Sequence, residues 1–148
     1  VTAEVTPTLQ AEEIVALQRI VRRVPVADHV VRYALRLVRS TRPNRPESPP
    51  LVRDYVTWGA GPRASQYLVL GAKARAVLQG RFSASCDDIR AVAHPVLRHR
   101  ILTNFNAEAD RVKPDDVVRR LLESVPDDDK VPGGNLPELF RSAGPGAS

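Results

Sequence analysis

The stretch Trp58-Gly59-Ala60-Gly61-Pro62-Arg63-Ala64-Ser65 determines where the central helix of this chain begins. Small residues let the backbone turn sharply before Pro62, and proline suits the first turn of a helix because the N–H that it lacks would have no partner there. We therefore expect a helix from Pro62 to about Gln79, ended by Gly80. Arg63 then lies in the first turn, where a helix N-terminus and a guanidinium fork both suit an anion such as a nucleotide phosphate. By residue type alone, an arginine that only projects into solvent is the more common case.

Two amphipathic helices are expected before this segment. The first runs from about Ala11 to Arg23 and has acids in its first turn. The second runs from about Ala27 to Thr41 and has arginines opposite its apolar stripe. The apolar residues at core spacing are Ile14, Leu17 and Val21 in the first helix, Val31, Ala34, Leu35 and Val38 in the second, and Tyr67, Leu70, Gly71, Ala74, Val77 and Leu78 in the central one.

Residues 43–61, between the second and the central helix, contain four prolines before Gly61 and break the helical periodicity. A connection of this length is uncommon in a compact domain and is often functional. Farther along, Ser85 and Asp88 have the spacing of a capping box for a fourth helix.

Pro95 interrupts or kinks that fourth helix, and residues 102–111 look irregular. Pro114 then opens a last helix, in which Leu121 belongs to the apolar stripe. The sequence therefore predicts an all-α bundle of about five helices with a long Pro-rich connection.

The chain has 148 residues, which suits one domain. We expect residues 1–8 to be the end of a linker, residues 9–125 to form the helical domain, and residues 126–148, rich in acids, glycine and proline, to be a disordered, flexible tail. The chain begins at Val1 and contains no methionine, so we interpret it as an excised fragment or a processed product.

The formal net charge is +5, but acids accompany the arginines on several predicted helices. Because binding to nucleic acid follows clustered rather than total charge, we expect no dedicated nucleic-acid surface. No apolar run approaches the roughly 20 residues that span a bilayer, and the N-terminus lacks a signal-peptide pattern. We therefore expect no membrane contact. Cys86 is the single cysteine, so no intramolecular disulfide can form, and we expect a cytoplasmic protein.

The sequence contains no pattern that is typical of a catalytic site. There is no glycine-rich phosphate loop ending in Lys-Ser/Thr, so we expect no catalytic residue in this chain. His94 and His99 are five residues apart, which misses the i, i+4 spacing of two metal ligands on one helical face. We therefore expect no metal site.

An ordered set of motifs gives the sequence a family resemblance. The motifs are Val38-Arg39-Ser40-Thr41-Arg42, Gly59-Ala60-Gly61-Pro62-Arg63-Ala64-Ser65, Ala72-Lys73-Ala74-Arg75-Ala76, Asp87-Asp88-Ile89, Pro95-Val96-Leu97-Arg98-His99-Arg100-Ile101, Asn104-Phe105-Asn106-Ala107-Glu108-Ala109 and Asp115-Asp116-Val117-Val118. Each is common alone, but their order and spacing are specific. From about Thr8 to Val125 the chain resembles the C-terminal lid domain of MoxR-type AAA+ ATPases.

The resemblance implies that Arg63 is the sensor-2 arginine, which contacts the phosphates of the nucleotide. It implies a parent protein with its own N-terminal ATPase domain that binds ATP and Mg²⁺, forms a hexameric ring and acts as a chaperone for assembly or for metal or cofactor insertion. A partner with a von Willebrand factor A domain is also implied. The lid alone is expected to bind nucleotide weakly at most. Arg98, His99 and Arg100 are candidates for lid or subunit contacts, although stabilising the break at Pro95 explains them equally well.

The sequence departs from the family pattern at three positions. Gly61 stands where serine is common, Cys86 replaces a proline and Ser83 replaces an aromatic residue. None of these changes affects Arg63.

Two other functions remain open. A basic helical nucleic-acid-binding module is suggested by the net charge and by Arg32, Arg36 and Arg39 along one helix face. An adaptor domain could instead dock a protein through Trp58, because aromatic residues are favoured anchors of interfaces. A lone tryptophan is, however, more often buried against its own loop.

Overall fold

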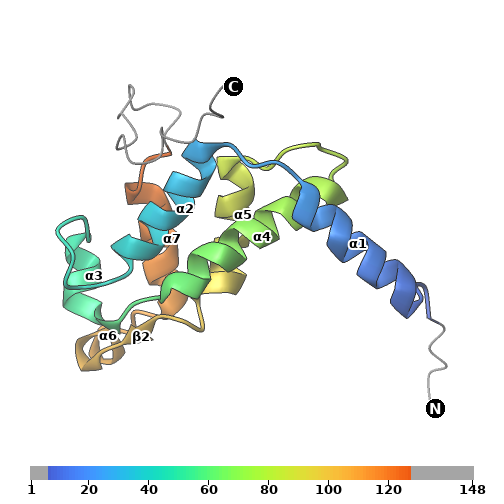
Figure 1. Ribbon diagram of the computed structural model, residues 1–148. Helices are drawn as coiled ribbons and strands as arrows, with labels where there is room; N and C mark the ends of the chain where they lie inside the picture. The colour runs from blue at the N-terminus through green and yellow to red at the C-terminus, as the bar shows by residue number, and fades with distance from the viewer. Residues whose placement is uncertain (1–6, 128–148) are drawn as a thin grey trace, which may run out of the picture.

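The computed structural model describes residues 7–127, which form seven helices and one short pair of antiparallel strands (Figure 1). In chain order the elements are α1 (Ala11–Arg23), α2 (Asp28–Ser40), α3 (Pro50–Tyr55), β1 (Val56–Trp58), α4 (Pro62–Leu78), α5 (Cys86–Leu97), β2 (Leu102–Thr103), α6 (Phe105–Ala109) and α7 (Pro114–Ser124). The predicted helical class is therefore confirmed. The expected linker, apart from Pro7 and Thr8, and the expected tail beyond Asp127 lie outside the described residues.

Local sequence signals fix the ends of the central helices. Pro62 is the first residue of α4, and Gly80 follows its end with a φ of +68°, a conformation that glycine adopts without a Cβ penalty. The Arg81 N–H returns to the Ala76 carbonyl at 2.8 Å, which closes the last turn. At the start of α5, the Asp88 carboxylate accepts the Ser85 N–H at 2.9 Å, so the predicted capping box is confirmed.

Pro95 does not interrupt α5, which continues to Leu97. Proline removes one backbone donor, so the carbonyl of Ala91 loses its usual partner. Both Ala91 and Pro95 are exposed, and water can therefore satisfy that carbonyl. The expected interruption is wrong because an exposed position tolerates the missing hydrogen bond.

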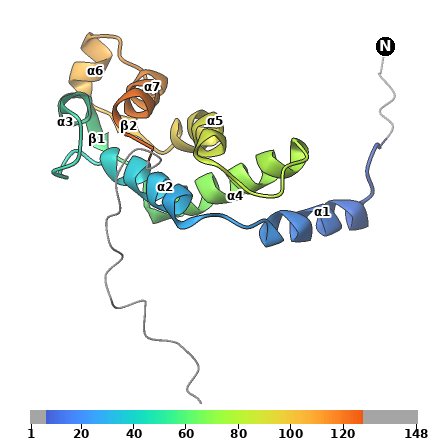
Figure 2. The same cartoon turned by 90° about the horizontal axis from the view of Figure 1, so that it is seen from above.

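The two segments expected to be irregular, residues 43–61 and 102–111, pack against each other. β1 and β2 pair in antiparallel fashion, with Val56 opposite Thr103, and α3 contacts α6. Asn104 connects the two segments, because its amide donates to the Asp54 carbonyl at 2.7 Å while its oxygen caps α6. Both segments lie at the end of the molecule opposite α1 (Figures 1 and 2).

The core is built on the small side chains of α4. The buried face of this helix carries Ala64, Leu68, Ala72 and Ala76, and α5 packs closely on it. The predicted core face of α4 is wrong: Tyr67 is 47% exposed and Leu78 is 87% exposed. α4 has apolar residues on nearly every side, so its periodicity does not specify which side another helix covers.

The other two predicted stripes are also shifted. In α2 the predicted Ala34 and Val38 are buried as expected, but Leu35 is 46% exposed. Tyr33 and Leu37, which we did not predict, are buried instead. α1 buries no residue at all, although it contacts α4. Figures 1 and 2 show α1 extending away from the bundle, and among the described helices α4 is its main neighbour.

Candidate functional site at the start of α4

Arg63 lies in the first turn of α4 and is exposed. Gly61 is the N-cap residue in an extended conformation, and the Ser65 hydroxyl donates to the Pro62 carbonyl at 2.7 Å. The N–H groups of the first turn point out of the helix end, where the helix dipole favours negative charge. Pro62 has no N–H, and the Gly61 carbonyl accepts the Ala64 N–H at 3.0 Å. The helix dipole and the Arg63 guanidinium are therefore the features that favour an anion at this exposed helix start.

A contact between two sequence motifs holds this helix start in place. The Thr41 hydroxyl accepts the Ala60 N–H at 2.8 Å and donates to the Val38 carbonyl at 2.7 Å. The Arg42 guanidinium donates to the Ala60 carbonyl at 3.1 Å. Both polar groups of the Ala60 backbone are thus bound by residues at the C-terminal end of α2, which fixes the strand-to-helix turn before Arg63.

Gly59 allows this close approach. A Cβ atom at Gly59 would lie 2.3 Å from the Thr41 carbonyl oxygen, a distance that no side chain can occupy. Gly61 has no such restriction, because a Cβ there would have no atom within 4 Å. Sequence reasoning treated both glycines as turn residues, and it missed that Gly59 packs against the backbone of Thr41.

A cavity of about 360 Å³ opens beside the same turn. Its walls come from the segment after α2, including Arg42 and Arg45, and from residues 57–62. Trp58 lines the cavity and is 72% exposed, so it is not buried against its own loop. The cavity combines arginine side chains, an aromatic ring and the backbone of the helix start.

Tyr67 lies one turn after Arg63 on the same face of α4. The Arg100 guanidinium stacks over the Tyr67 ring at 5.0 Å from its centroid and also donates to the Val96 carbonyl. The structure thus brings Arg100 to the helix face that begins with Arg63. His99 contacts Arg100 through its Nε2 atom.

Arg98 contacts a different helix. Its Nε lies 3.2 Å from the Asp115 carboxylate, which also contacts His94 Nδ1 at 2.9 Å. Asp115 is in the first turn of α7, so these contacts join α5 to α7. Arg98 and Arg100 therefore both make contacts within the domain at the end of α5.

The basic residues of α2 also have partners inside the domain. Arg39 forms an ion pair with Glu47 at 2.7 Å, and Arg36 donates to the Pro126 carbonyl at 2.9 Å. These contacts hold the loop after α2 and the end of the described chain. They account for two of the three arginines that suggested a nucleic-acid surface.

Comparison with known proteins gives consistent results. Residues 50–121 match the family model of the AAA lid domain. The chain is 33% identical over 141 residues to Chaperone MoxR1 of Mycobacterium tuberculosis, covering 91% of this chain and 37% of that protein. It is 39% identical over 73 residues to Protein MoxR of Methylorubrum extorquens, covering 48% of this chain and 21% of that protein.

A solved structure is also similar. The crystal structure of a candidate ATPase from Cytophaga hutchinsonii superposes with a TM-score of 0.73 at 27% identity, over 78% of this chain and 35% of that one. The fold and the turn before α4 thus define an AAA lid domain. More particularly, the chain belongs to the MoxR family. It spans about a third of the length of MoxR1.

Within residues 7–127, no helix combines the length and apolarity needed to cross a membrane.

Proposed function

We propose that Arg63 is the sensor-2 arginine of a MoxR-type ATPase and that this lid couples ATP hydrolysis to movement of its own ATPase domain. The observation that carries the proposal is the exposed Arg63 at the start of α4, directly after the turn that Thr41 and Arg42 hold. A guanidinium in this position adds charge-assisted donors to those of the helix N-terminus. A nucleotide phosphate is the anion that an AAA+ protein places beside its lid.

The rest of the active site would be supplied by the ATPase domain. That domain binds ATP and Mg²⁺ and carries the phosphate loop, whereas the lid supplies charge from the other side. Arg63 contacts the γ-phosphate, either in its own subunit or in its neighbour. Tyr67 and Arg100 continue the face that Arg63 begins, so they, with Arg98 and His99 nearby, are candidates for contacts to the ATPase domain or to the next subunit.

At the level of the whole protein, we propose a cytoplasmic hexameric ring that acts as a chaperone. Chaperone MoxR1 is so described in its name, and the shared lid supports the same class of activity here. The work done on a client would be assembly or the insertion of a metal or cofactor, with a von Willebrand factor A domain protein as partner. Nucleic acid has no part in this proposal.

The test is steady-state phosphate release by the protein that joins this lid to its ATPase domain. A supplied arginine can accelerate phosphoryl transfer by about 10³–10⁵, and a sensor that shares this function with Mg²⁺ and other cations should lie near or below the lower end. Arg63→Ala should therefore reduce ATP turnover sharply. Arg63→Lys should restore little of it, because an ammonium lacks the guanidinium fork.

The matched control is Arg120→Ala, which removes an exposed arginine from α7, far along the chain from Arg63. Circular dichroism should show an unchanged fold for all three variants, because an exposed arginine contributes little packing. Wild-type turnover by Arg63→Ala would disprove the sensor assignment.

A further inference from the structure

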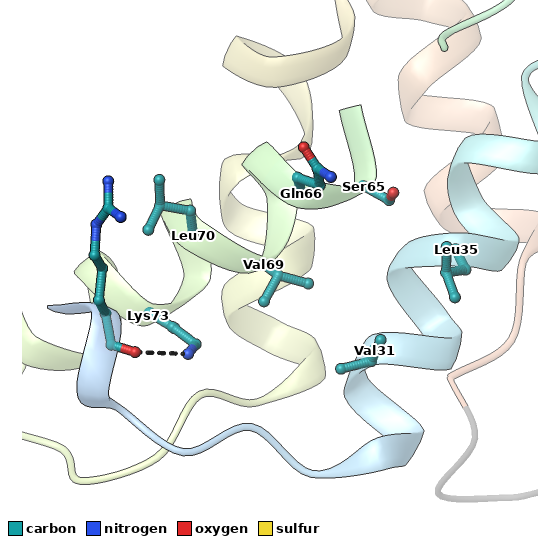
Figure 3. A pocket seen from close by; sticks show the side chains of 8 residues that line it. Val31, Leu35, Ser65, Gln66, Val69, Leu70 and Lys73 are labelled. Carbon is teal, nitrogen blue, oxygen red and sulfur yellow. Dashed lines mark hydrogen bonds between the residues drawn. The ribbon is translucent and has the colours of Figure 1, made fainter. Parts of the chain in front are cut away.

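A groove of about 560 Å³ lies between α1, α2 and α4, and of the residues described at the start of α4 it includes Ser65 but not Arg63. Val31 and Leu35 line it from α2, and Val69 and Leu70 line it from α4 (Figure 3). Leu35 is 46% exposed and Leu70 is 40% exposed. The groove therefore offers apolar side chains that the described residues leave partly open to solvent.

One end of the groove is basic. Lys73 and Arg22 line it there, and the Lys73 ammonium donates to the Arg22 carbonyl at 3.2 Å (Figure 3). This bond holds Lys73 between α4 and the end of α1. A ligand of the groove should therefore combine apolar side chains with a carboxylate.

The described chain ends against α2, the helix that forms one wall of this groove. Arg36 follows Leu35 in α2 and donates to the Pro126 carbonyl at 2.9 Å. The chain that continues from Asp127 thus starts about one helix diameter, roughly 10 Å, from the groove.

The sequence after Asp127 contains one segment with the required chemistry. Leu136-Pro137-Glu138-Leu139-Phe140 places three apolar residues at spacings of three and four, with a carboxylate between them. Within five residues the segment therefore combines three large apolar side chains with one carboxylate. Apart from this segment, the only large aliphatic residue from Asp128 to Ser148 is Val131.

The chain between Asp127 and Leu136 is long enough for residues 136–140 to reach the groove. Nine residue steps separate Asp127 from Leu136, and an extended chain spans about 30 Å over that length. This exceeds the distance to the groove by a wide margin. A short tether also gives a millimolar effective concentration, so even a weak contact is populated.

We propose that the groove between α1, α2 and α4 binds residues 136–140 of its own chain. Leu136, Leu139 and Phe140 fill the apolar part between α2 and α4, and Glu138 lies toward Lys73 and Arg22. The groove is thus a docking site for a short acidic and apolar peptide, and the chain carries such a peptide itself.

Nuclear magnetic resonance of the complete 148-residue chain tests this proposal without nucleotide, so its outcome is independent of the Arg63 experiment. Contacts should appear between the Phe140 ring and the methyl groups of Val69 and Leu70. Leu139→Ser should abolish these contacts and shift the groove signals. A peptide of residues 133–143, added to the Leu139→Ser chain, should reverse those shifts.

Matched variants separate docking from a general loss of apolar surface. Leu70→Ser should abolish the contacts, whereas Leu78→Ser, on the same helix and 87% exposed, should retain them. Val131→Ser should likewise have no effect. Absence of the Phe140 contacts in the wild-type chain would overturn the proposal. So would contacts that disappear on dilution, because they would identify a second copy as the occupant.

Discussion

Among single residues, Gly59 and Thr41 hold the turn that precedes Arg63. Thr41 binds the Ala60 N–H, and only a residue without a Cβ can lie against the Thr41 carbonyl as Gly59 does. Thr41 and Gly59 are eighteen residues apart in the sequence, with a proline-rich segment, α3 and β1 between them. Their contact explains why the turn before α4 contains two glycines with different tolerance for a side chain.

Gly59→Ala should lower the free energy of unfolding by about 1–3 kcal/mol, because the new methyl group must displace the Thr41 backbone. Gly61→Ala is the matched control. Its Cβ meets open space, and the loss of a favoured N-cap residue should cost at most about 1 kcal/mol. Urea unfolding of both variants measures the difference. Equal stabilities would show that the turn is not packed as described.

At the scale of the element, α4 has two apolar faces with different environments. Leu68 is fully buried against the core, whereas Leu78, the last residue of the helix, is 87% exposed. Leu68→Ala should therefore cost about 2–5 kcal/mol and Leu78→Ala less than about 0.5 kcal/mol in thermal or urea unfolding. A larger loss of stability for Leu78→Ala than for Leu68→Ala would show that α4 buries the face that periodicity alone predicted.

The connection between α4 and α5 depends on one buried carboxylate. Asp88 is fully buried, accepts hydrogen bonds from Arg75 at 2.8 Å and from Arg81, and caps α5 through Ser85. Burial opposes its charge, but the bonds from Arg81, the Ser85 N–H and Arg75 outweigh that effect and hold the pKa of Asp88 well below its usual range.

This low pKa predicts an acid-sensitive contribution to stability. A carboxyl group with a lowered folded-state pKa stabilises the fold above its unfolded pKa, near 3.9, and loses that contribution as the pH falls toward the folded value. Asp88→Asn should lower the free energy of unfolding by about 2–3 kcal/mol at pH 7. This is a small loss for a broken buried ion pair, because the side chains of Arg75 and Arg81 are both partly exposed. Urea unfolding should show that the difference from wild type narrows between about pH 4 and pH 2. A difference independent of pH would contradict this role.

At the scale of the whole molecule, the lid is a helical bundle with one helix extended from it. α1 buries no residue, whereas α4 and α5 form the best-packed pair. Regions with few buried apolar contacts open at low free-energy cost. Amide hydrogen exchange should therefore be fast throughout α1 and slow in α4 and α5. Comparable protection of α1 would indicate that another surface covers it.

The isolated lid should bind nucleotide only weakly. Arg63 and the helix start provide one side of a phosphate site, and the remaining contacts would come from the ATPase domain. Calorimetric titration of the 148-residue chain with ATP and Mg²⁺ measures this directly. Sub-micromolar affinity would contradict the division of the site between two domains.

The amino-acid sequence alone predicts the helical class, the family, the start of α4 at Pro62, its end before Gly80 and the capping box of α5. These features depend on neighbouring residues, whose conformational preferences act over three or four positions. The buried face of α4, the partial exposure of Leu35 and the contact of Thr41 with Gly59 depend on how the helices pack together. Apolar periodicity reports that a helix has a face to bury, but it does not identify the neighbour that covers it, and contacts between distant segments follow from packing that no local pattern encodes.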